Sequence, residues 1–358
     1  MAKSIYVTST QAYSGKSALC VGLLRRFRQD GYKVGYMKPV STSTRVLCGE
    51  RIMDEDSHFV KYTFDLPDAL EDMAPVLLHD RQVAEVLNGQ KMDYADRVKA
   101  SFEKIAQGRD VVVLEGGGNL REGWIVQLAP PHVSNLLGAA ELIVVTYDHD
   151  LQVVDDLITA RVRLGRSLIG GIINVVPHHR LEFVREKIKP FIEKHEVPIL
   201  AVLPKEPVLL SASVAELRDG LCGEVLCGQH HLDELVETVM VGAMSVDSAL
   251  TYFRRKANKA VITGGDRPDI QLAALETSTK CLILTGNIRP SPMILGRAEE
   301  KGVPIIMTYH DTYTVVEMIE SFFGKTRFHQ QNKVDRFDAL LCENIDFPAL
   351  YAALGLQK

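Results

Sequence analysis

The sequence predicts an α/β protein whose first half is a mainly parallel, doubly wound sheet and whose second half is a smaller α/β unit. Three observations lead to this fold class. Apolar, β-branched runs alternate with amphipathic stretches along most of the chain. A loop containing glycine and lysine joins the first strand to the first helix. Clear periodicity is lost near residues 205–215, where we place the boundary between the two halves.

The chain opens with a short apolar strand, a polar loop and an amphipathic helix, at Ile5–Val7, Thr10–Ser17 and Ser17–Gln29. This order is typical of a phosphate-binding loop, because backbone N–H groups at the helix start form an anion nest. Lys16 can reach the outer phosphates of a nucleotide, and the Ser17 hydroxyl can ligate Mg²⁺. Thr10 stands where the common pattern has its first glycine. A structural strand-to-helix turn with a solvent-facing lysine is therefore the alternative.

A second strand, a lysine–proline pair and an acidic helix start follow, at Lys33–Met37, Lys38-Pro39 and Asp54–Asp56. A lysine at the carboxyl end of a parallel strand lies at the edge where open α/β sheets bind ligands. The alternative for Lys38 is a surface lysine beside a turn proline. Acids in a first helical turn complement the helix dipole, and they are also oxygen ligands that Mg²⁺ accepts. Residues 64–107 indicate helices and loops without evident chemistry.

The run Asp110–Leu114 predicts a fully buried central strand, and it ends in Glu115 followed by three glycines. A carboxylate at this strand tip is where a phosphate-loop enzyme places a metal-side acid. The glycines let the backbone approach phosphate or substrate closely. Together these features extend the candidate nucleotide site to a second strand end.

Further strands and helices alternate up to the boundary: strands at Leu142–Thr146, Leu168–Val175 and Val197–Pro204, helices at Leu151–Leu164 and Leu181–His195. This alternation predicts the doubly wound sheet. Asn174, near a strand end, carries an amide of the kind that reads an adenine edge. A structural asparagine in a turn is the alternative.

The second half repeats the alternation, with strands at Ala260–Thr263, Cys281–Thr285 and Val303–Thr308 and helices at Ile270–Glu276, Met293–Lys301 and Thr312–Phe322. We expect a second candidate site where these strands end, because such loops converge on one edge of a sheet. Its residues are Asp266, Arg267, Thr285, Gly286 and His310. They suit an anion or nucleotide, with Arg267 making bidentate contacts. Alternatively the loops are tight turns, in which Asp266 caps the next helix and Arg267 pairs with it.

Composition restricts the class of protein. Hydrophobic residues make up 46% and charged residues 24% of the chain, and the net charge is −5. These values are ordinary for a globular protein and give no support for binding to nucleic acid or to a membrane surface. The six cysteines show no C-x-x-C spacing, and the first strand begins too early to leave room for a signal peptide. We therefore expect a cytoplasmic protein with reduced thiols.

Assembled in order, the first half resembles the dethiobiotin synthetase family and the related cobyrinic acid a,c-diamide synthases. The matching segments are Ser9–Ser17, Lys38-Pro39, Asp56, Glu115–Gly118 and Asn174. The family also has a threonine at the place of Thr10. The resemblance implies a P-loop NTPase-like fold that binds ATP and Mg²⁺. It implies nucleotide contacts from Thr10, Ser14, Gly15, Lys16, Ser17, Ala18, Asn174 and Pro204, metal ligation by Ser17, Asp56 and Glu115, and catalytic roles for Lys16 and Lys38.

The second half is similar to the DRTGG domain, with Asp266-Arg267 and Thr285-Gly286 at its naming residues and Asn287 in place of the last glycine. Both halves together resemble the N-terminal region of long bacterial phosphotransacetylases. The resemblance implies a nucleotide-binding domain at 1–208, a DRTGG-like domain at 209–332 and an extension at 333–358. Acetyl transfer is not expected, because the chain stops where the acetyltransferase domain of those proteins begins.

Two functions of different class remain open. The first is a nucleotide-binding sensor or regulatory protein, expected to be a homo-oligomer that acts on a partner enzyme. The second is an ATP-dependent carboligase or amide-forming enzyme, in which Lys38 stabilises charge on an activated acid. The retained lysines and acids favour the enzyme. Gln11 and Tyr13, which replace acids of the dethiobiotin synthetase loop, and the missing Ser-Pro-His-x-Ala-Ala segment favour regulation.

Overall fold

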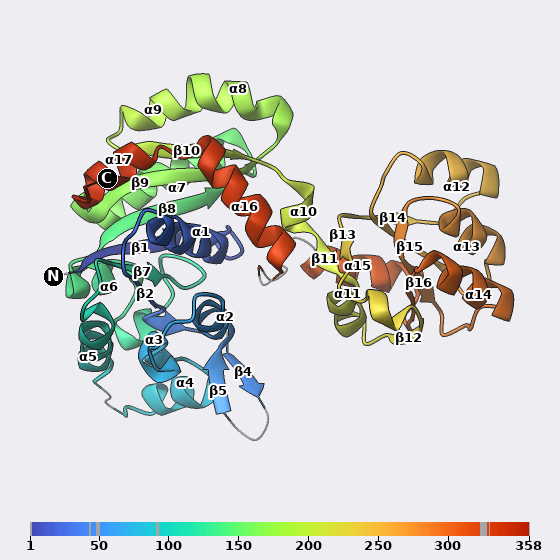
Figure 1. The fold of residues 1–358 in the computed structure, drawn as a ribbon, viewed down its shortest axis with the longest axis horizontal. Helices are drawn as coiled ribbons and strands as arrows, with labels where there is room; N and C mark the ends of the chain where they lie inside the picture. The colour runs from blue at the N-terminus through green and yellow to red at the C-terminus, as the bar shows by residue number, and fades with distance from the viewer. Residues whose placement is uncertain are drawn as a thin grey trace. The chain divides into compact units, whose positions relative to one another are not determined.

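The computed structural model describes residues 2–42, 44–47, 51–90, 93–322, 328 and 330–357. The chain forms two compact units, which we describe separately (Figure 1). Unit 1 comprises residues 1–205 and 328–358, and unit 2 comprises residues 206–327. The functional division into 1–208, 209–332 and 333–358 stays a prediction.

Unit 1 is built on a six-stranded sheet in which every pair of neighbouring strands is parallel. In spatial order the strands are β10 (Ile199–Pro204), β9 (Leu168–Val176), β8 (Ala140–Thr146), β1 (Lys3–Ser9), β7 (Val111–Glu115) and β2 (Val34–Met37). The chain first crosses from β1 to β2 on one side and later continues through β8 to β10 on the other. The carboxyl end of β1 therefore lies at the point where the strand order reverses, which is where such sheets bind ligands. The predicted doubly wound sheet is confirmed.

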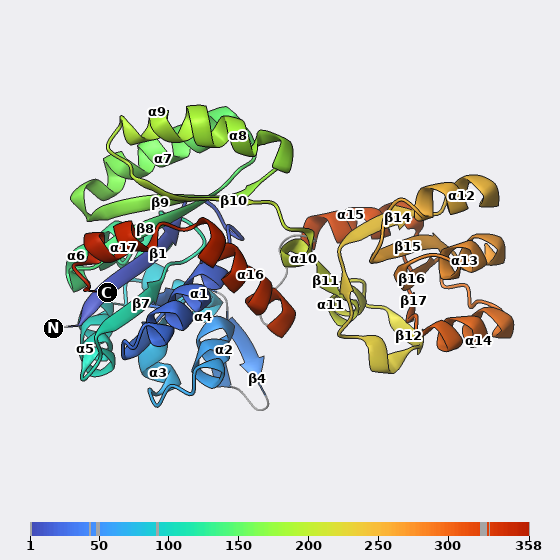
Figure 2. The ribbon, with the colours of Figure 1, turned by 45° about the horizontal axis from the view of Figure 1, so that its top comes forward.

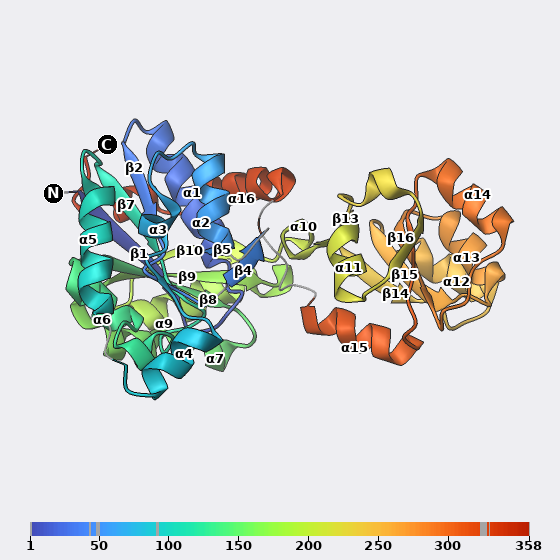
Figure 3. The ribbon, with the colours of Figure 1, turned by 90° about the horizontal axis from the view of Figure 1, so that it is seen from below.

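Helices cover both faces of this sheet (Figures 1 and 3). One face carries α1 (Lys16–Gln29), α16 (Gln331–Asn344) and α17 (Phe347–Leu354). The other carries α5 (Tyr94–Ala106), α6 (Pro130–Leu137), α7 (Asp150–Leu164) and α9 (Lys189–Glu193). The segment expected as one helix at Leu181–His195 is instead α8 (Leu181–Phe183), a π-helix (Val184–Ile188) and α9.

Between β2 and β7 the chain forms small elements that the sequence did not predict individually. A hairpin of β4 (Thr44–Leu47) and β5 (Arg51–Asp54) leads directly into the acidic helix α2 (Glu55–Thr63). The remaining elements of unit 1 are short: β3 (Val40–Ser41), α3 (Leu70–Met73), β6 (Val76–Leu77), α4 (Asp80–Leu87) and 3₁₀ helices at Trp124–Val126, Gly165–Ser167 and His178–Arg180.

The C-terminal segment completes the face of unit 1 that α1 begins. A Cβ atom at Gly22 of α1 would lie 2.3 Å from Cδ1 of Leu341 in α16, so the two helices meet at a glycine. The ring of Phe27 in α1 also packs against Tyr351 of α17, with centroids 5.7 Å apart. Residues 331–354 thus belong to the core of the first unit although they follow the second unit in sequence.

Unit 2 contains a five-stranded sheet in the order β12 (Glu224–Cys227), β17 (Ile305–Met307), β16 (Thr279–Thr285), β15 (Lys259–Gly264) and β14 (Thr238–Val241) (Figure 2). Strands β14 to β17 are parallel, and β12 is an antiparallel edge strand. Helices α12 (Val246–Phe253), α13 (Pro268–Leu275) and α14 (Pro292–Lys301) cover one face, and α11 (Val214–Gly220) and α15 (Thr312–Phe322) the other. The predicted smaller α/β unit is confirmed, while β12 and β14 were not predicted.

Short elements complete unit 2: α10 (Pro207–Leu210), β11 (Ala212–Ser213), a 3₁₀ helix (Gln229–His231) and β13 (Leu235–Val236). Among the described residues of both units, no helix combines the length and the apolar composition needed to cross a bilayer.

A fully buried carboxylate lies in the sheet of unit 1, at Glu141 of β8. The hydroxyls of Thr8 and Ser167 donate to it from 3.4 Å, which is long for bonds to a carboxylate. Burial therefore dominates and raises the pKa of Glu141 from 4.5 to about 7.

This raised pKa makes the stability of unit 1 dependent on pH. The native state keeps the proton of Glu141 up to about pH 7, whereas the unfolded chain releases it near pH 4.5. The contribution of Glu141 to stability is therefore largest below pH 4.5 and is lost as the pH rises to 7. Glu141→Gln removes this titration. We therefore expect the free energy of unfolding of the variant, relative to that of wild type, to be about 2–3 kcal/mol higher at pH 8 than at pH 5. Urea unfolding at both pH values measures the gain.

The exposed Glu182 provides the control, because Glu182→Gln removes a carboxylate without a buried environment. A difference between wild type and Glu141→Gln that is the same at pH 5 and pH 8 would contradict the assignment.

The contact of α16 with α1 gives a second prediction about stability. Leu341→Ala opens a cavity beside Gly22, so we expect a loss of about 2–4 kcal/mol in the free energy of unfolding of unit 1. Trp124 is the only tryptophan of the chain and belongs to unit 1, so its fluorescence follows this unit specifically. The exposed Glu343 in the same helix gives the matched control, Glu343→Ala. Equal stabilities of the two variants would show that α16 contributes nothing to the core of unit 1.

Candidate functional site

The loop between β1 and α1 folds tightly around the start of the helix. Gly15, just before α1, has a φ of 94°, which is in the left-handed region that favours glycine. A Cβ atom at this position would lie 2.6 Å from Nδ2 of Asn174, so the site also lacks space for a side chain. Tyr13 has a φ of 56° and an exposed side chain. These two positions turn the loop so that α1 begins at Lys16.

Lys16 is buried under the loop that it follows, with 7% of its surface exposed. Its ammonium lies 3.4 Å from the Ser14 hydroxyl oxygen and 3.5 Å from the carbonyl oxygen of Gln11. Both distances are long for hydrogen bonds from a charged donor. Burial lowers the pKa of Lys16, and Glu115 and Glu122 oppose that shift. A buried cation with such weak partners suits an anion bound in the loop.

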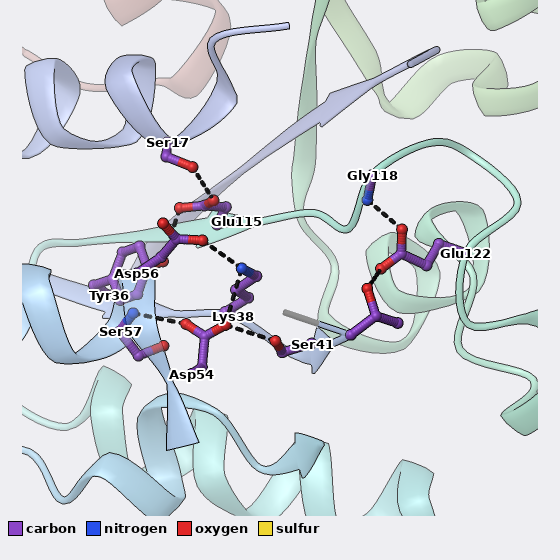
Figure 4. A network of polar contacts seen from close by, with 11 residues as sticks. Ser17, Tyr36, Lys38, Ser41, Asp54, Asp56, Ser57, Glu115, Gly118 and Glu122 are labelled. Atoms are coloured by element: carbon purple, nitrogen blue, oxygen red, sulfur yellow. Dashed lines mark hydrogen bonds and ion pairs between the residues drawn. The ribbon is translucent and has the colours of Figure 1, made fainter. Parts of the chain in front are cut away.

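Next to the phosphate loop, a group of polar side chains meets around Glu115, at the tip of β7 (Figure 4). The Ser17 hydroxyl donates to Glu115 Oε1 at 2.6 Å, and the Tyr36 hydroxyl donates to Oε2 at 2.8 Å. Burial, together with the neighbouring Asp56, raises the pKa of Glu115 to about 7 against the opposing effect of Lys38. The structure thus brings together all three residues expected to ligate a metal: Ser17, Asp56 and Glu115.

Lys38 is held between two carboxylates of the acidic cluster. Its Nζ lies 2.5 Å from Asp56 Oδ2 and 3.0 Å from Asp54 Oδ2. Asp54 also accepts hydrogen bonds from the Ser41 hydroxyl at 2.6 Å and from the Ser57 N–H at 2.7 Å, so it caps α2. Burial alone lowers the pKa of Lys38, but the charges of Asp56, Asp54 and Glu115 outweigh it and raise the pKa well above its usual value. Lys38 therefore carries its charge, already shared between two partners.

The charges of this group fit a divalent cation. Three carboxylates, on Asp54, Asp56 and Glu115, act on the ammonium of Lys38, and two of them, Asp54 and Glu115, are buried. No set of three or more histidine, cysteine or acidic side chains among the described residues is arranged to hold a metal. Two carboxylates and the Ser17 hydroxyl nevertheless suit Mg²⁺, which takes few protein ligands and completes its shell with phosphate oxygens and water.

Asn174 is hydrogen-bonded to the phosphate loop. Its side-chain Nδ2 donates to the carbonyl oxygen of Ser14 at 2.8 Å, and its Oδ1 accepts from the N–H of Val175 at 2.9 Å. Thr10 at the start of the loop donates to Asp156 of α7 at 2.9 Å. An adenine contact by Asn174 stays a prediction, since both ends of its amide already bond to the backbone.

The other two residues predicted to contact the nucleotide, Ala18 and Pro204, lie in α1 and in β10. Ala18 is buried in the first turn of α1. Pro204 ends the outermost strand, β10, and its register partner is Val176 of β9. Neither position gives a contact that identifies its role.

Sequence reasoning missed Glu122, which lies on the other side of the site from Glu115 (Figure 4). Its carboxylate accepts the N–H of Gly118 and, at 2.5 Å, the hydroxyl of Thr42. The signal for it was present in the glycines after β7. They were expected to admit a phosphate or substrate, and here they admit the chain's own carboxylate. Asp54 was noted only as part of an acidic helix start, and its bond to Lys38 was not predicted.

In unit 2 the three strand-end loops of the second candidate site are joined to one another. The Gly286 N–H donates to the His310 carbonyl at 2.9 Å, and the Gly265 N–H donates to the Thr285 carbonyl at 3.3 Å. The Thr285 hydroxyl bonds to the Thr312 hydroxyl at 2.8 Å. Thr285, Gly286 and His310 therefore lie at one edge of the sheet, with some of their backbone donors already engaged.

Arg267 turns towards its own helix. Both Nε and Nη2 lie 3.0 Å from the carboxylate of Asp269, and Nη2 also donates to the Met244 carbonyl at 3.1 Å. Helix α13 has no side-chain cap, so Asp266 does not cap it. Arg267 pairs with Asp269, not with Asp266 as the tight-turn alternative supposed. A ligand at this edge stays a prediction.

Comparison with known proteins assigns both halves. Residues 3–213 match the AAA domain family, and residues 216–322 match the DRTGG domain. The phosphate acetyltransferase of Nitratidesulfovibrio vulgaris is 26% identical over 384 residues, covering 100% of this chain and 52% of that protein. That of Synechocystis sp. is 24% identical, covering 97% and 51%. The ATP-dependent dethiobiotin synthetase of Aromatoleum aromaticum is 26% identical over 221 residues, covering 58% of this chain and 95% of that one.

Two solved structures show more distant likeness. The MinD cell division protein of Aquifex aeolicus matches 58% of this chain and 85% of its own, with 15% identity and a TM-score of 0.37. The CBS and DRTGG domains of the regulatory region of Clostridium perfringens pyrophosphatase, solved with the activator diadenosine tetraphosphate, match 32% and 50%, with 28% identity and a TM-score of 0.28.

These matches confirm the resemblances to dethiobiotin synthetases, to phosphate acetyltransferases and to the DRTGG domain. The chain spans about half the length of the phosphate acetyltransferases that it matches. It belongs to the AAA domain family through residues 3–213, with a DRTGG domain following.

Proposed function

We propose that unit 1 binds ATP together with Mg²⁺ at the loop between β1 and α1. The observation that carries the proposal is the buried ammonium of Lys16, with only long contacts, beside the hydrogen-bonded pair of Ser17 and the buried Glu115. An anion and a cation placed side by side would satisfy both groups. A nucleoside triphosphate with its magnesium ion is such a ligand. Membership of the AAA domain family and similarity to an ATP-dependent synthetase support the same ligand.

Each residue has a role in this complex that follows from its position. Lys16 and the N–H groups at the start of α1 bind the outer phosphates. Ser17, Asp56 and Glu115 hold Mg²⁺ directly or through water. The bound Mg²⁺ neutralises part of the phosphate charge. Asn174 keeps the loop in shape through its bond to the Ser14 carbonyl.

We further propose that the nucleotide acts as a regulatory signal, which the DRTGG domain passes to a second copy of the chain or to a partner enzyme. Two contacts support regulation over ligase chemistry. Lys38 is held between Asp54 and Asp56, so it is poorly placed to stabilise new charge on a substrate. Glu122 already bonds to Gly118, where a second substrate was expected to approach.

An ATP-dependent carboligase or amide-forming enzyme is the alternative function, since Lys16, Lys38 and the metal-side acids are all present. ATP turnover distinguishes the two. Under the regulatory proposal, turnover is slow and unchanged by diaminopelargonate with bicarbonate. A clear stimulation by that pair would establish the ligase.

Lys16→Ala tests the nucleotide site most simply. Losing the charge-assisted contact to phosphate should weaken ATP binding by about ten- to a hundred-fold. Calorimetry with Mg·ATP measures the affinity, and Lys187→Ala, which removes an exposed lysine of unit 1, is the matched control. Equal affinities of wild type and Lys16→Ala would place the nucleotide elsewhere.

A comparison of two buried glutamates tests whether Glu115 contributes to Mg²⁺ binding. Glu115 and Glu141 are both buried, and burial raises the pKa of each to about 7, but only Glu115 contacts Ser17. We expect Glu115→Gln to lower the gain in ATP affinity that Mg²⁺ provides by about ten-fold or more, in line with changes next to bound metals. Glu141→Gln should keep the full gain. If both variants respond to Mg²⁺ like wild type, Glu115 serves only the fold.

A further inference from the structure

The carboxylate of Glu115 receives a hydrogen bond on each of its oxygens, from two different elements of unit 1. The Ser17 hydroxyl of α1 donates to Oε1 at 2.6 Å, and the Tyr36 hydroxyl of β2 donates to Oε2 at 2.8 Å (Figure 4). Ser17 lies in the first turn of the helix that follows the phosphate loop, so its bond belongs to the nucleotide site. Tyr36 comes instead from a fully buried strand, and none of the roles in the proposed nucleotide complex belongs to it.

The sheet itself carries Tyr36 to this carboxylate. Strands β2 and β7 are parallel neighbours, and Tyr36 is the register partner of Val113. Alternate residues of a strand share one face of a sheet, so Val113 and Glu115 point to the same side. From its place beside Val113, the long tyrosine side chain spans two residues of β7 and reaches Glu115. Both side chains are buried, Tyr36 completely and Glu115 with 2% of its surface exposed.

Two bonds at opposite oxygens restrict how the carboxylate can turn. The last torsion of a glutamate side chain has a broad range of allowed angles, so a bond at Oε1 alone would leave Oε2 free to move. Tyr36 holds Oε2 from the sheet, and its bond does not depend on the conformation of the phosphate loop. Oε1 is thereby kept towards Ser17, the side on which the proposed Mg²⁺ is bound.

The bond also has a simpler interpretation, because a buried tyrosine hydroxyl needs an acceptor whatever the site does. The identity of the acceptor favours a functional role. Glu115 is one of the three residues proposed to hold the metal, and the carboxylate ligands of metal sites are oriented by hydrogen bonds from an outer layer of side chains. Tyr36 stands in that relation to Glu115 and Ser17.

We propose that Tyr36 is a positioning residue for the metal, which holds the Glu115 carboxylate in the orientation that nucleotide-bound Mg²⁺ requires. The inference rests on the proposed function, since it concerns the metal of the same site. Tyr36 does not touch the ion and acts through Glu115. Binding of the phosphates is left to Lys16 and the loop.

Tyr36→Phe tests this role, because it removes the hydroxyl and keeps the buried ring. Calorimetry measures the ATP affinity with Mg²⁺ and without it, and the ratio of the two affinities is the gain that Mg²⁺ provides. We expect Tyr36→Phe to lower this gain about ten-fold. A general disturbance of the site would weaken both affinities alike and leave their ratio unchanged. The matched control is Tyr6→Phe, which removes the hydroxyl of a buried tyrosine in β1, opposite Leu114, and should keep the wild-type gain.

A double variant tests whether Tyr36 acts through the carboxylate. If it does, adding Tyr36→Phe to Glu115→Gln produces no further loss of the gain, because the group to be oriented is already changed. A further loss in the double variant would overturn the proposed route through Glu115.

The single variants and wild type separate the remaining outcomes. A Tyr36→Phe variant that keeps the wild-type gain, or loses no more of it than Tyr6→Phe, would show that the tyrosine serves only the fold, and the proposed function would stand. A wild-type protein whose ATP affinity does not respond to Mg²⁺ would overturn the proposed function, and this inference with it.

Discussion

The burial of Glu115 at the tip of β7 is the constraint on which the rest of the site depends. A carboxylate without water is costly unless cations or hydrogen-bond donors surround it, and this one receives the hydroxyls of Ser17 and Tyr36. Its closest charged neighbours oppose each other, since Asp56 raises its pKa and Lys38 lowers it. The site is therefore short of positive charge where a nucleotide-bound metal would supply it. The proposed metal binding and the electrostatics of the site thus depend on the same side chain, Glu115.

The sheet makes this concentration of charge possible. Because β7 and β8 both pair with β1, the phosphate loop, the Glu115 tip and Asn174 come to one edge of the sheet, although they are far apart in sequence. The hydrogen bond from Asn174 to Ser14 and the glycine conformation at Gly15 then fix the loop. On the opposite side of the loop Glu122 occupies a space bounded by two glycines. One edge thus brings together the lysines and the carboxylates of the proposed nucleotide site.

Local patterns predicted what depends on neighbours in sequence, and missed what depends on partners far along the chain. The strand, loop and helix around Lys16 follow from periodicity and glycine placement, as does the buried strand that ends at Glu115. The ion pairs of Lys38 with Asp54 and Asp56 could not be predicted from local patterns, because α2 must first pack beside β2 to bring the two carboxylates to the lysine. The hydrogen bond between Glu122 and the Gly118 N–H depends on a turn, and hydrophobic periodicity does not predict turns of this kind. Leu341 packs on Gly22 only because the last helices close a face of unit 1.

Proton release on binding of Mg·ATP tests the central claim most directly. If a metal ion neutralises Glu115, whose pKa is raised to about 7, binding at pH 6.5 must displace its proton. Calorimetry in buffers of different ionisation enthalpy measures the number of protons released. We expect release at pH 6.5 that is larger in wild type than in Glu115→Gln, and a difference that vanishes at pH 8.5, where Glu115 is already ionised. Equal proton release by wild type and Glu115→Gln at pH 6.5 would contradict the account.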